Sequence, residues 1–212
     1  NNRKVYEKYK DKILYLYKLD RFIADRYSKV VKRIQSSNTD IDNMLNAMLL
    51  SEFRRLYALA KYGTYIKPVL MFKSQRIEAS NEAHEKFNRM IEQLTVDQLN
   101  DFLQRQIKVM KDSDTLSIAH NFYLKNKEKW PEIIRDIQRE FGSNRIINAN
   151  DTTRSGLLEK GQYEALNSLE SPSNLYRVIF AVARLTEGWD VINLYDTVRL
   201  RGDLNAKGTK GS

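Results

Sequence analysis

Residues 178–191, with the sequence VIFAVARLTEGWDV, decide how the rest of the chain is interpreted. The segment begins with an apolar run, and residues 177–182 give the strongest strand prediction in the chain, a buried strand. The next residues include a threonine, a glycine and an aspartate, and they predict a tight turn. A second strand is expected after the turn.

Three other short segments also predict strands, an apolar run at residues 68–73 and the segments 145–149 and 195–200. Helical patterns separate them, so the chain is expected to form an α/β fold with a mainly parallel sheet. Ligands of such sheets bind beyond the carboxyl ends of the strands. Two segments are expected there, Lys73–Ser74 and residues 183–190.

The predicted helices have recognisable start and stop signals. A polar stretch at residues 36–40 offers N-cap residues, and Gly63 is placed to end the helix that follows. Thr95 is a candidate N-cap, while Pro131 and Gly142 bracket another helix. Residues 150–175 are expected to form a loop with one short helix. The remaining helices are predicted at residues 41–62, 77–92 and 132–141.

The first third of the chain is basic. Residues 1–67 hold 15 Lys and Arg against 7 Asp and Glu, within a chain whose net charge is +9. Apolar residues from Val5 to Ile23 recur every three or four positions, which predicts a helix. Such a segment could attract polyanions, or its charges could simply form a solvated helical surface. We divide the chain into a basic helical segment at 1–63, an α/β domain at 64–200 and a tail at 201–212.

The turn after the strongest strand has the chemistry of a phosphate site. A glycine after a strand lets backbone amides approach a phosphate, and a threonine hydroxyl can contact one without adding charge. An aspartate in the same turn can accept hydrogen bonds from a ribose. Alone, the same residues could form only a tight turn with Trp189 in the core.

The extended segment at 178–200 resembles motif V of superfamily 2 helicases, and most closely the restriction (Res) subunit of type III restriction-modification enzymes. Residues 66–74, IKPVLMFKS, look like that family's motif IV, and residues 168–174 look like its approach to motif V. The resemblance implies a RecA-like second motor domain of a P-loop NTPase-type helicase. Residues 1–50 match no part of the family that we can place.

The resemblance also implies roles for individual residues. Gly188, Asp190 and Glu187 would face the nucleotide. Lys73, Ser74, Ala183, Arg184 and Thr186 would face the nucleic-acid backbone. ATP and Mg²⁺ would be the cofactors of the full-length protein, and its partners would be DNA, the first motor domain of the same polypeptide and a modification (methyltransferase) subunit.

Several parts of such an enzyme have no counterpart in these 212 residues. No P-loop or Mg²⁺-binding Asp-Glu motif occurs, and neither the arginine-finger motif VI nor a nuclease domain follows. We therefore expect an incomplete motor that neither hydrolyses ATP nor cuts DNA alone, and no complete catalytic set.

Composition excludes some other classes. The chain has no cysteine, so disulfides and thiolate metal sites are impossible, and His84 and His120 are its only histidines. No metal site, membrane span or signal peptide is expected, and a cytoplasmic location is consistent with this. Two alternatives stay open: another superfamily 2 helicase or type I restriction motor, and a non-catalytic basic module that binds DNA or protein.

Overall fold

A computed structural model describes residues 7–12, 17–25, 27, 32–34, 38–108, 115–150, 160–182 and 191–201. The chain forms two compact units, residues 1–37 and residues 38–212. The first unit holds 11 Lys and Arg against 4 Asp and Glu, so most of the excess positive charge belongs to it. Among the described residues, no helix is long and apolar enough to cross a membrane.

The first unit differs from the continuous helix that its periodicity predicts. It contains a 3-10 helix, η1 (Lys10–Lys12), and a short helix, α2 (Leu19–Ala24). Lys18 lies between them with extended backbone angles, so a single helix through residues 5–23 is wrong. The rings of Tyr17, Phe22 and Tyr27 contact one another, while Phe22 and Tyr27 keep 36% and 69% of their surface exposed. Those of its periodic apolar residues whose side chains are described, Tyr9, Phe22 and Ile23, are exposed.

The second unit contains a four-stranded sheet in which all described strands are parallel. The strands are β1 (Val69–Ser74), β2 (Ile146–Asn148), β3 (Val178–Val182) and β4 (Leu194–Arg199), in the order β2-β3-β1-β4. β1 pairs with β3 through residues level with each other, such as Ser74 and Val182, and with β4 on its other side. All four strands lie within a residue or two of their predicted positions.

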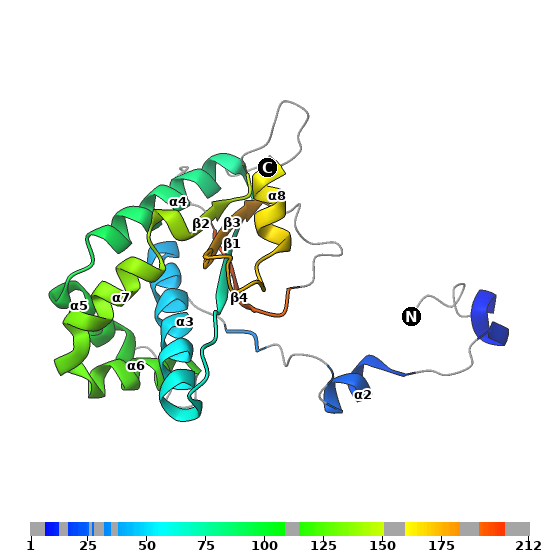
Figure 1. The fold of residues 1–212 in the computed structure, drawn as a ribbon, viewed down its shortest axis with the longest axis horizontal. Coiled ribbons are helices and arrows are strands. Elements are labelled where there is room, and N and C mark those ends of the chain that lie inside the picture. Colours follow the sequence, from blue (N-terminus) through cyan, green and yellow to red (C-terminus); the bar gives the residue numbers. More distant parts are fainter. Residues whose placement is uncertain are drawn as a thin grey trace, which may run out of the picture. The chain divides into compact units, whose positions relative to one another are not determined.

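Helices cover the two faces of this sheet unequally (Figure 1). One face packs against α3 (Asp40–Tyr62), α4 (Ile77–Glu92), α5 (Val96–Ile107), α6 (Thr115–Lys125) and α7 (Trp130–Glu140). The other face packs against α8 (Lys160–Asn167). Short 3-10 helices, η2 (Lys127–Lys129) and η3 (Ser143–Arg145), precede α7 and β2.

Strand residues alternate between the two faces, as the pleat requires. Leu70, Phe72 and Phe180 belong to the core cluster beneath α3 and α4, whereas Met71 and Ile179 belong to the cluster beneath α8. This double burial explains why β1 and β3 appear in the sequence as continuous apolar runs. The residues of β4 instead alternate between half-buried and exposed. Each large side chain buried in this way contributes roughly 1.5–3 kcal/mol.

The helix ends follow the predicted signals. The Thr39 side chain accepts a hydrogen bond from the Asp42 amide, and Gly63 ends α3 with φ of 62°. Thr95 and Gln98 form a reciprocal capping box at the start of α5. Trp130 is buried at the start of α7, and its indole Nε1 donates to the Tyr123 carbonyl at 2.8 Å.

The boundary between compact units lies before α3 and not at residue 63, where we had divided the chain. Met48 and Leu49 of α3 are fully buried in the core of the second unit. Helix α3 is therefore part of the α/β unit, because its apolar side covers the sheet. Helix α6 was not predicted.

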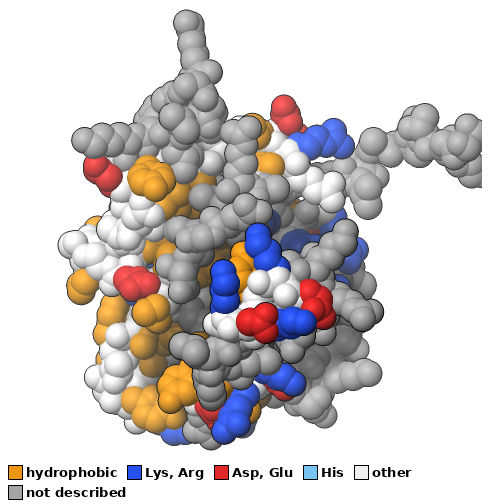
Figure 2. All heavy atoms as spheres, turned by 90° about the vertical axis from the view of Figure 1, so that its right-hand side faces the viewer, with side chains coloured by type: hydrophobic (Ala, Val, Ile, Leu, Met, Phe, Trp, Pro, Cys, Tyr) orange, Lys and Arg blue, Asp and Glu red, His pale blue; other side chains and the backbone are white. Residues whose placement is uncertain are grey.

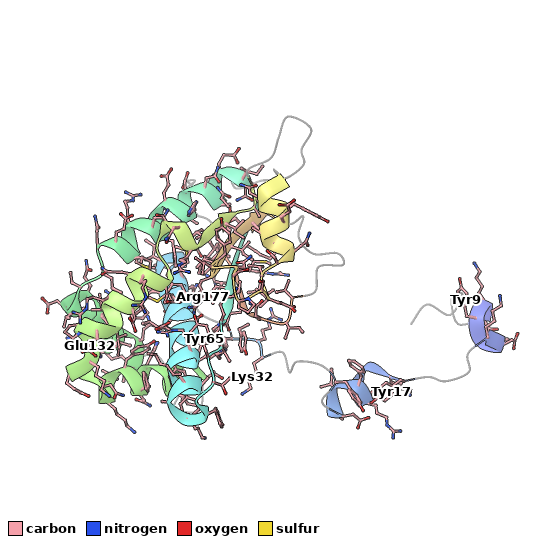
Figure 3. All side chains as sticks on the ribbon, viewed as in Figure 1. Tyr9, Tyr17, Lys32, Tyr65, Glu132 and Arg177 are labelled. Atoms are coloured by element: carbon pink, nitrogen blue, oxygen red, sulfur yellow. The ribbon has the colours of Figure 1, made fainter. Side chains whose placement is uncertain are left out.

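A buried ionic cluster lies at the amino ends of the strands (Figure 3). Arg177, only 1% exposed, donates to the Glu140 carboxylate at 2.8 Å and to the Pro68 carbonyl at 2.9 Å. Its guanidinium lies over the Phe141 ring, and burial lowers its pKa. Glu52, with no exposed surface, is held by Arg55 of the same helix. The cluster ties α3 and α7 to β3.

Candidate functional site at the carboxyl ends of the strands

The strand order places a topological switch point between β1 and β3. From β1 the chain crosses β3 to reach β2, whereas from β3 it crosses β1 in the opposite direction to reach β4. The connection after β1 packs on the α4 face, and Val191, near the end of the connection after β3, packs in the α8 cluster. Ligands of open α/β sheets bind beyond the carboxyl ends of the strands at such a switch point.

Both segments that we singled out from the sequence start at this point. Ser74 is the last residue of β1, and Val182, level with it in the sheet, is the last residue of β3. Ala183, Arg184, Thr186, Glu187, Gly188 and Asp190 follow Val182 directly, but they lie outside the described residues. Their predicted roles therefore stay predictions.

Lys73 and Ser74 differ in accessibility. Lys73 is half-buried, while Ser74 is 6% exposed and its hydroxyl is covered. The Ser74 Oγ atom has no hydrogen-bond partner among the described residues. Burying a hydroxyl without a hydrogen-bond partner costs free energy. The Ser74 oxygen could therefore still form a hydrogen bond beside the switch point.

A network of neutral polar side chains, not singled out from the sequence, lies at the same ends of the strands. Asn150 Nδ2 donates to Ser80 Oγ at 2.7 Å and to Asn148 Oδ1 at 2.8 Å. Asn148 Nδ2 donates to Asn81 Oδ1 at 3.0 Å, and the Val182 amide donates to Asn150 Oδ1 at 2.9 Å. The sequence signal for this network is slight: Asn148 lies within a predicted strand and Asn150 directly follows it.

The charge around this end favours an anion without forming a metal site. Arg76 lies just after β1, close to Lys73 in the chain, and Arg199 ends β4, level with Lys73 in the sheet. Both arginines are exposed. Glu78 in the first turn of α4 opposes them in part. Figure 2 shows Lys and Arg side chains beside Asp and Glu side chains on the face that it draws. No group of three His, Asp or Glu side chains that could hold a metal occurs among the described residues.

The two histidines are not members of this hydrogen-bond network. His84 of α4 stacks on the Phe180 ring at 5.0 Å between centroids, so it packs on the core. His120 is 1% exposed, and its Nε2 lies 2.8 Å from Asn46 Oδ1. Burial lowers the pKa of His120 to about 4.

The fold and the switch point define an α/β domain with a parallel sheet, as in RecA-like motor domains. Comparison with known proteins indicates which family of such proteins the chain resembles. The chain is 32% identical over 220 residues to the probable type III restriction-modification enzyme HindVIP Res subunit of Haemophilus influenzae. The match covers 98% of this chain and 42% of that protein's length. The chain is therefore a homologue of type III Res subunits, as its motifs predicted.

Two other comparisons add nothing to this assignment. No protein-family model matches the chain. No solved structure matches it either. The assignment rests on the extended sequence similarity, and the observed parallel sheet agrees with it.

Proposed function

We propose that this chain is the second motor domain of an ATP-dependent DNA translocase in a type III restriction enzyme. It would contribute one wall of the ATP cleft and part of the DNA-binding surface. The observation that carries the proposal is the location of the motif V-like segment, which starts at the switch point in a chain similar to a Res subunit over 98% of its length. Switch points are where ligands of open parallel sheets bind.

The residues divide between two ligands in this proposal. Gly188, Asp190 and Glu187 face the nucleotide, because a glycine admits the phosphates and carboxylates can orient a ribose or a partner domain's groups. Thr186 and the backbone of residues 183–184 face the DNA phosphates. Lys73 and Ser74 reach the same strand from the end of β1, where Lys73 supplies charge and Ser74 a hydroxyl that has no partner among the described residues.

The other wall of the cleft would come from a first motor domain on the same polypeptide, which would supply the P-loop and the Mg²⁺ ligand. The HindVIP Res subunit is more than twice as long as this chain, so there is room in such a protein for these parts. ATP and Mg²⁺ would bind between the two domains, and hydrolysis would change the cleft. DNA and a modification subunit would be the macromolecular partners.

The test is ATP hydrolysis by the complete protein that contains this chain, measured with and without duplex DNA. DNA should stimulate hydrolysis, and Asp190→Ala should lower the stimulated rate by about 100-fold, the scale expected when reacting groups lose their alignment. Asp101→Ala, an exposed aspartate on α5, is the matched control and should leave the rate unchanged. Equal rates for the two variants would show that the motif is not part of the cleft.

A non-catalytic basic module gives a different result in the same protein. Its DNA binding would weaken steeply with salt, survive Thr186→Ala and Asp190→Ala, and disappear when basic residues in 1–67 are replaced. The first unit holds 11 basic and 4 acidic residues, and this positive charge is the reason to test the basic-module alternative.

A further inference from the structure

Asn150 completes the hydrogen bonding of β3 where the neighbouring strand has ended. β2 has only three residues, and its last, Asn148, lies level with Phe180. β3 continues for two more residues, so the Val182 amide has no backbone partner from β2. Asn150 Oδ1 accepts that amide at 2.9 Å and takes the place of the missing strand.

The amide of Asn150 is itself fixed by its surroundings. Asn150 is 7% exposed, and both of its donor bonds go to other side chains, Ser80 Oγ of α4 and Asn148 Oδ1. Asn148 is bonded in turn to Asn81 of α4 and to the Asn150 backbone amide. The end of β3 is thus connected to the first half of α4, the helix that follows β1.

We infer that Asn150 is a positioning residue, which fixes where the segment at 183–190 begins relative to α4 and the end of β1. Ala183, the first residue of the segment, is bonded to Val182, so a displacement of Val182 also displaces the start of the segment. The consequence for activity rests on the proposed function, in which this segment binds nucleotide and DNA. The hydrogen-bonding role at β3 does not.

The chain contains a matched control at the opposite end of the same strand. Asn174, 9% exposed, accepts the Tyr176 amide at 3.0 Å. Its Nδ2 donates to the Ala165 carbonyl at 2.7 Å and to Ser168 Oγ at 3.0 Å. Each asparagine therefore accepts one backbone amide next to β3 and donates two bonds, and replacing either should have a similar general effect on stability.

The first measurement is amide hydrogen exchange on this chain in three forms, wild type, Asn150→Ala and Asn174→Ala. Exchange at Val182 should be about tenfold faster in Asn150→Ala and unchanged in Asn174→Ala, because only the first loses that bond. If the two variants change Val182 equally, or if neither does, Asn150 does not fix the end of β3 and the inference is overturned.

The second measurement is DNA-stimulated ATP hydrolysis by the complete protein. Asn150→Ala should lower kcat by about tenfold and raise the DNA concentration for half-maximal stimulation, since misplaced groups lose alignment. Asn174→Ala should stay within about twofold of wild type at the same temperature. Equal losses in both variants would indicate a general stability effect and overturn the positioning role.

The two proposals fail in different ways. If the wild-type complete protein shows no DNA-stimulated hydrolysis, the proposed function fails, and the exchange result alone decides whether Asn150 fixes β3. If Asn150→Ala does not fold, Ser80→Ala removes one of the two acceptors that orient the amide. It should change Val182 exchange and kcat in the same directions by a smaller factor, and a result identical to Asn174→Ala would overturn the inference.

Discussion

The amino and carboxyl ends of the strands both bury polar side chains, but they do so with different chemistry. At the amino ends, Arg177 and Arg55 are enclosed with Glu52 and Glu140 in a charged cluster. At the carboxyl ends, the buried network around Asn150 consists of asparagine and serine. One end is held by matched opposite charges and the other by neutral dipoles.

The difference has consequences for ligand binding. A buried ion pair is already matched, and an added phosphate would have to displace one of its members. A neutral network offers hydrogen bonds without opposing a negative ligand, and it costs less to bury. Lys73, Arg76 and Arg199 add positive charge at the same ends of the strands, opposed in part by Glu78. We therefore interpret the amino ends as the structural side of the sheet and the carboxyl ends as the functional side.

The largest expected effect comes from breaking the charged cluster. Arg177→Met should reduce the free energy of unfolding by about 3–5 kcal/mol, because it leaves Glu140 buried without its 2.8 Å partner. Urea unfolding of the chain at pH 7 measures this. Arg139→Met is the control, since the Arg139 side chain is 59% exposed at the rim of the same cluster. Similar losses in the two variants would mean that burial of the cluster contributes little.

A smaller loss of stability is expected when the pH is lowered, because the buried neutral side chain of His120 must then compete with its protonated form in the unfolded state. The pKa of His120 is about 4 in the folded chain, because burial disfavours its charged form, against an ordinary value of about 6.5. The unfolded state therefore binds more protons between these values, and stability falls as pH falls through that window. Between pH 7 and pH 5 the loss should be about 2 kcal/mol.

The comparison with His120→Gln isolates this contribution. Urea unfolding of both forms at pH 7 and pH 5 should give a smaller pH dependence for the variant, because all other titrating groups are shared. The same pH dependence in both forms would mean that His120 is protonated in the folded state near its ordinary pKa.

Local patterns were enough to predict most of the elements of the second unit. Apolar runs located β1, β2 and β3 because these strands are buried on both faces, whereas β4 alternates between half-buried and exposed residues. Thr39, Gly63 and Thr95 act as caps through bonds to their near neighbours. Helix α6 was missed because its buried side includes polar residues. Ser117 and His120 are buried there, and the Nε2 atom of His120 lies 2.8 Å from Asn46 Oδ1 of another helix.

Only part of the candidate site could be predicted from the sequence. The motif at 183–190 could be recognised because its residues are adjacent in the chain. The network beside it could not, since Asn150 lies 70 residues from Ser80 and 32 from Val182. In the first unit the periodicity was present but gave no continuous helix, because periodicity indicates an apolar stripe and not a surface to bury it against.

The smallest expected loss of stability comes from a substitution in the neutral network. Asn148→Ala should cost about 1 kcal/mol, because it removes the 3.0 Å bond to Asn81 and one acceptor of Asn150. With Asn81→Ala and the double variant, urea unfolding gives a coupling free energy, expected to be about 0.5 kcal/mol. The same cycle on Arg177 and Glu140 should give a coupling several times larger, because buried charges interact more strongly than neutral dipoles. Equal couplings at the two ends would remove the distinction between a structural and a functional side of the sheet.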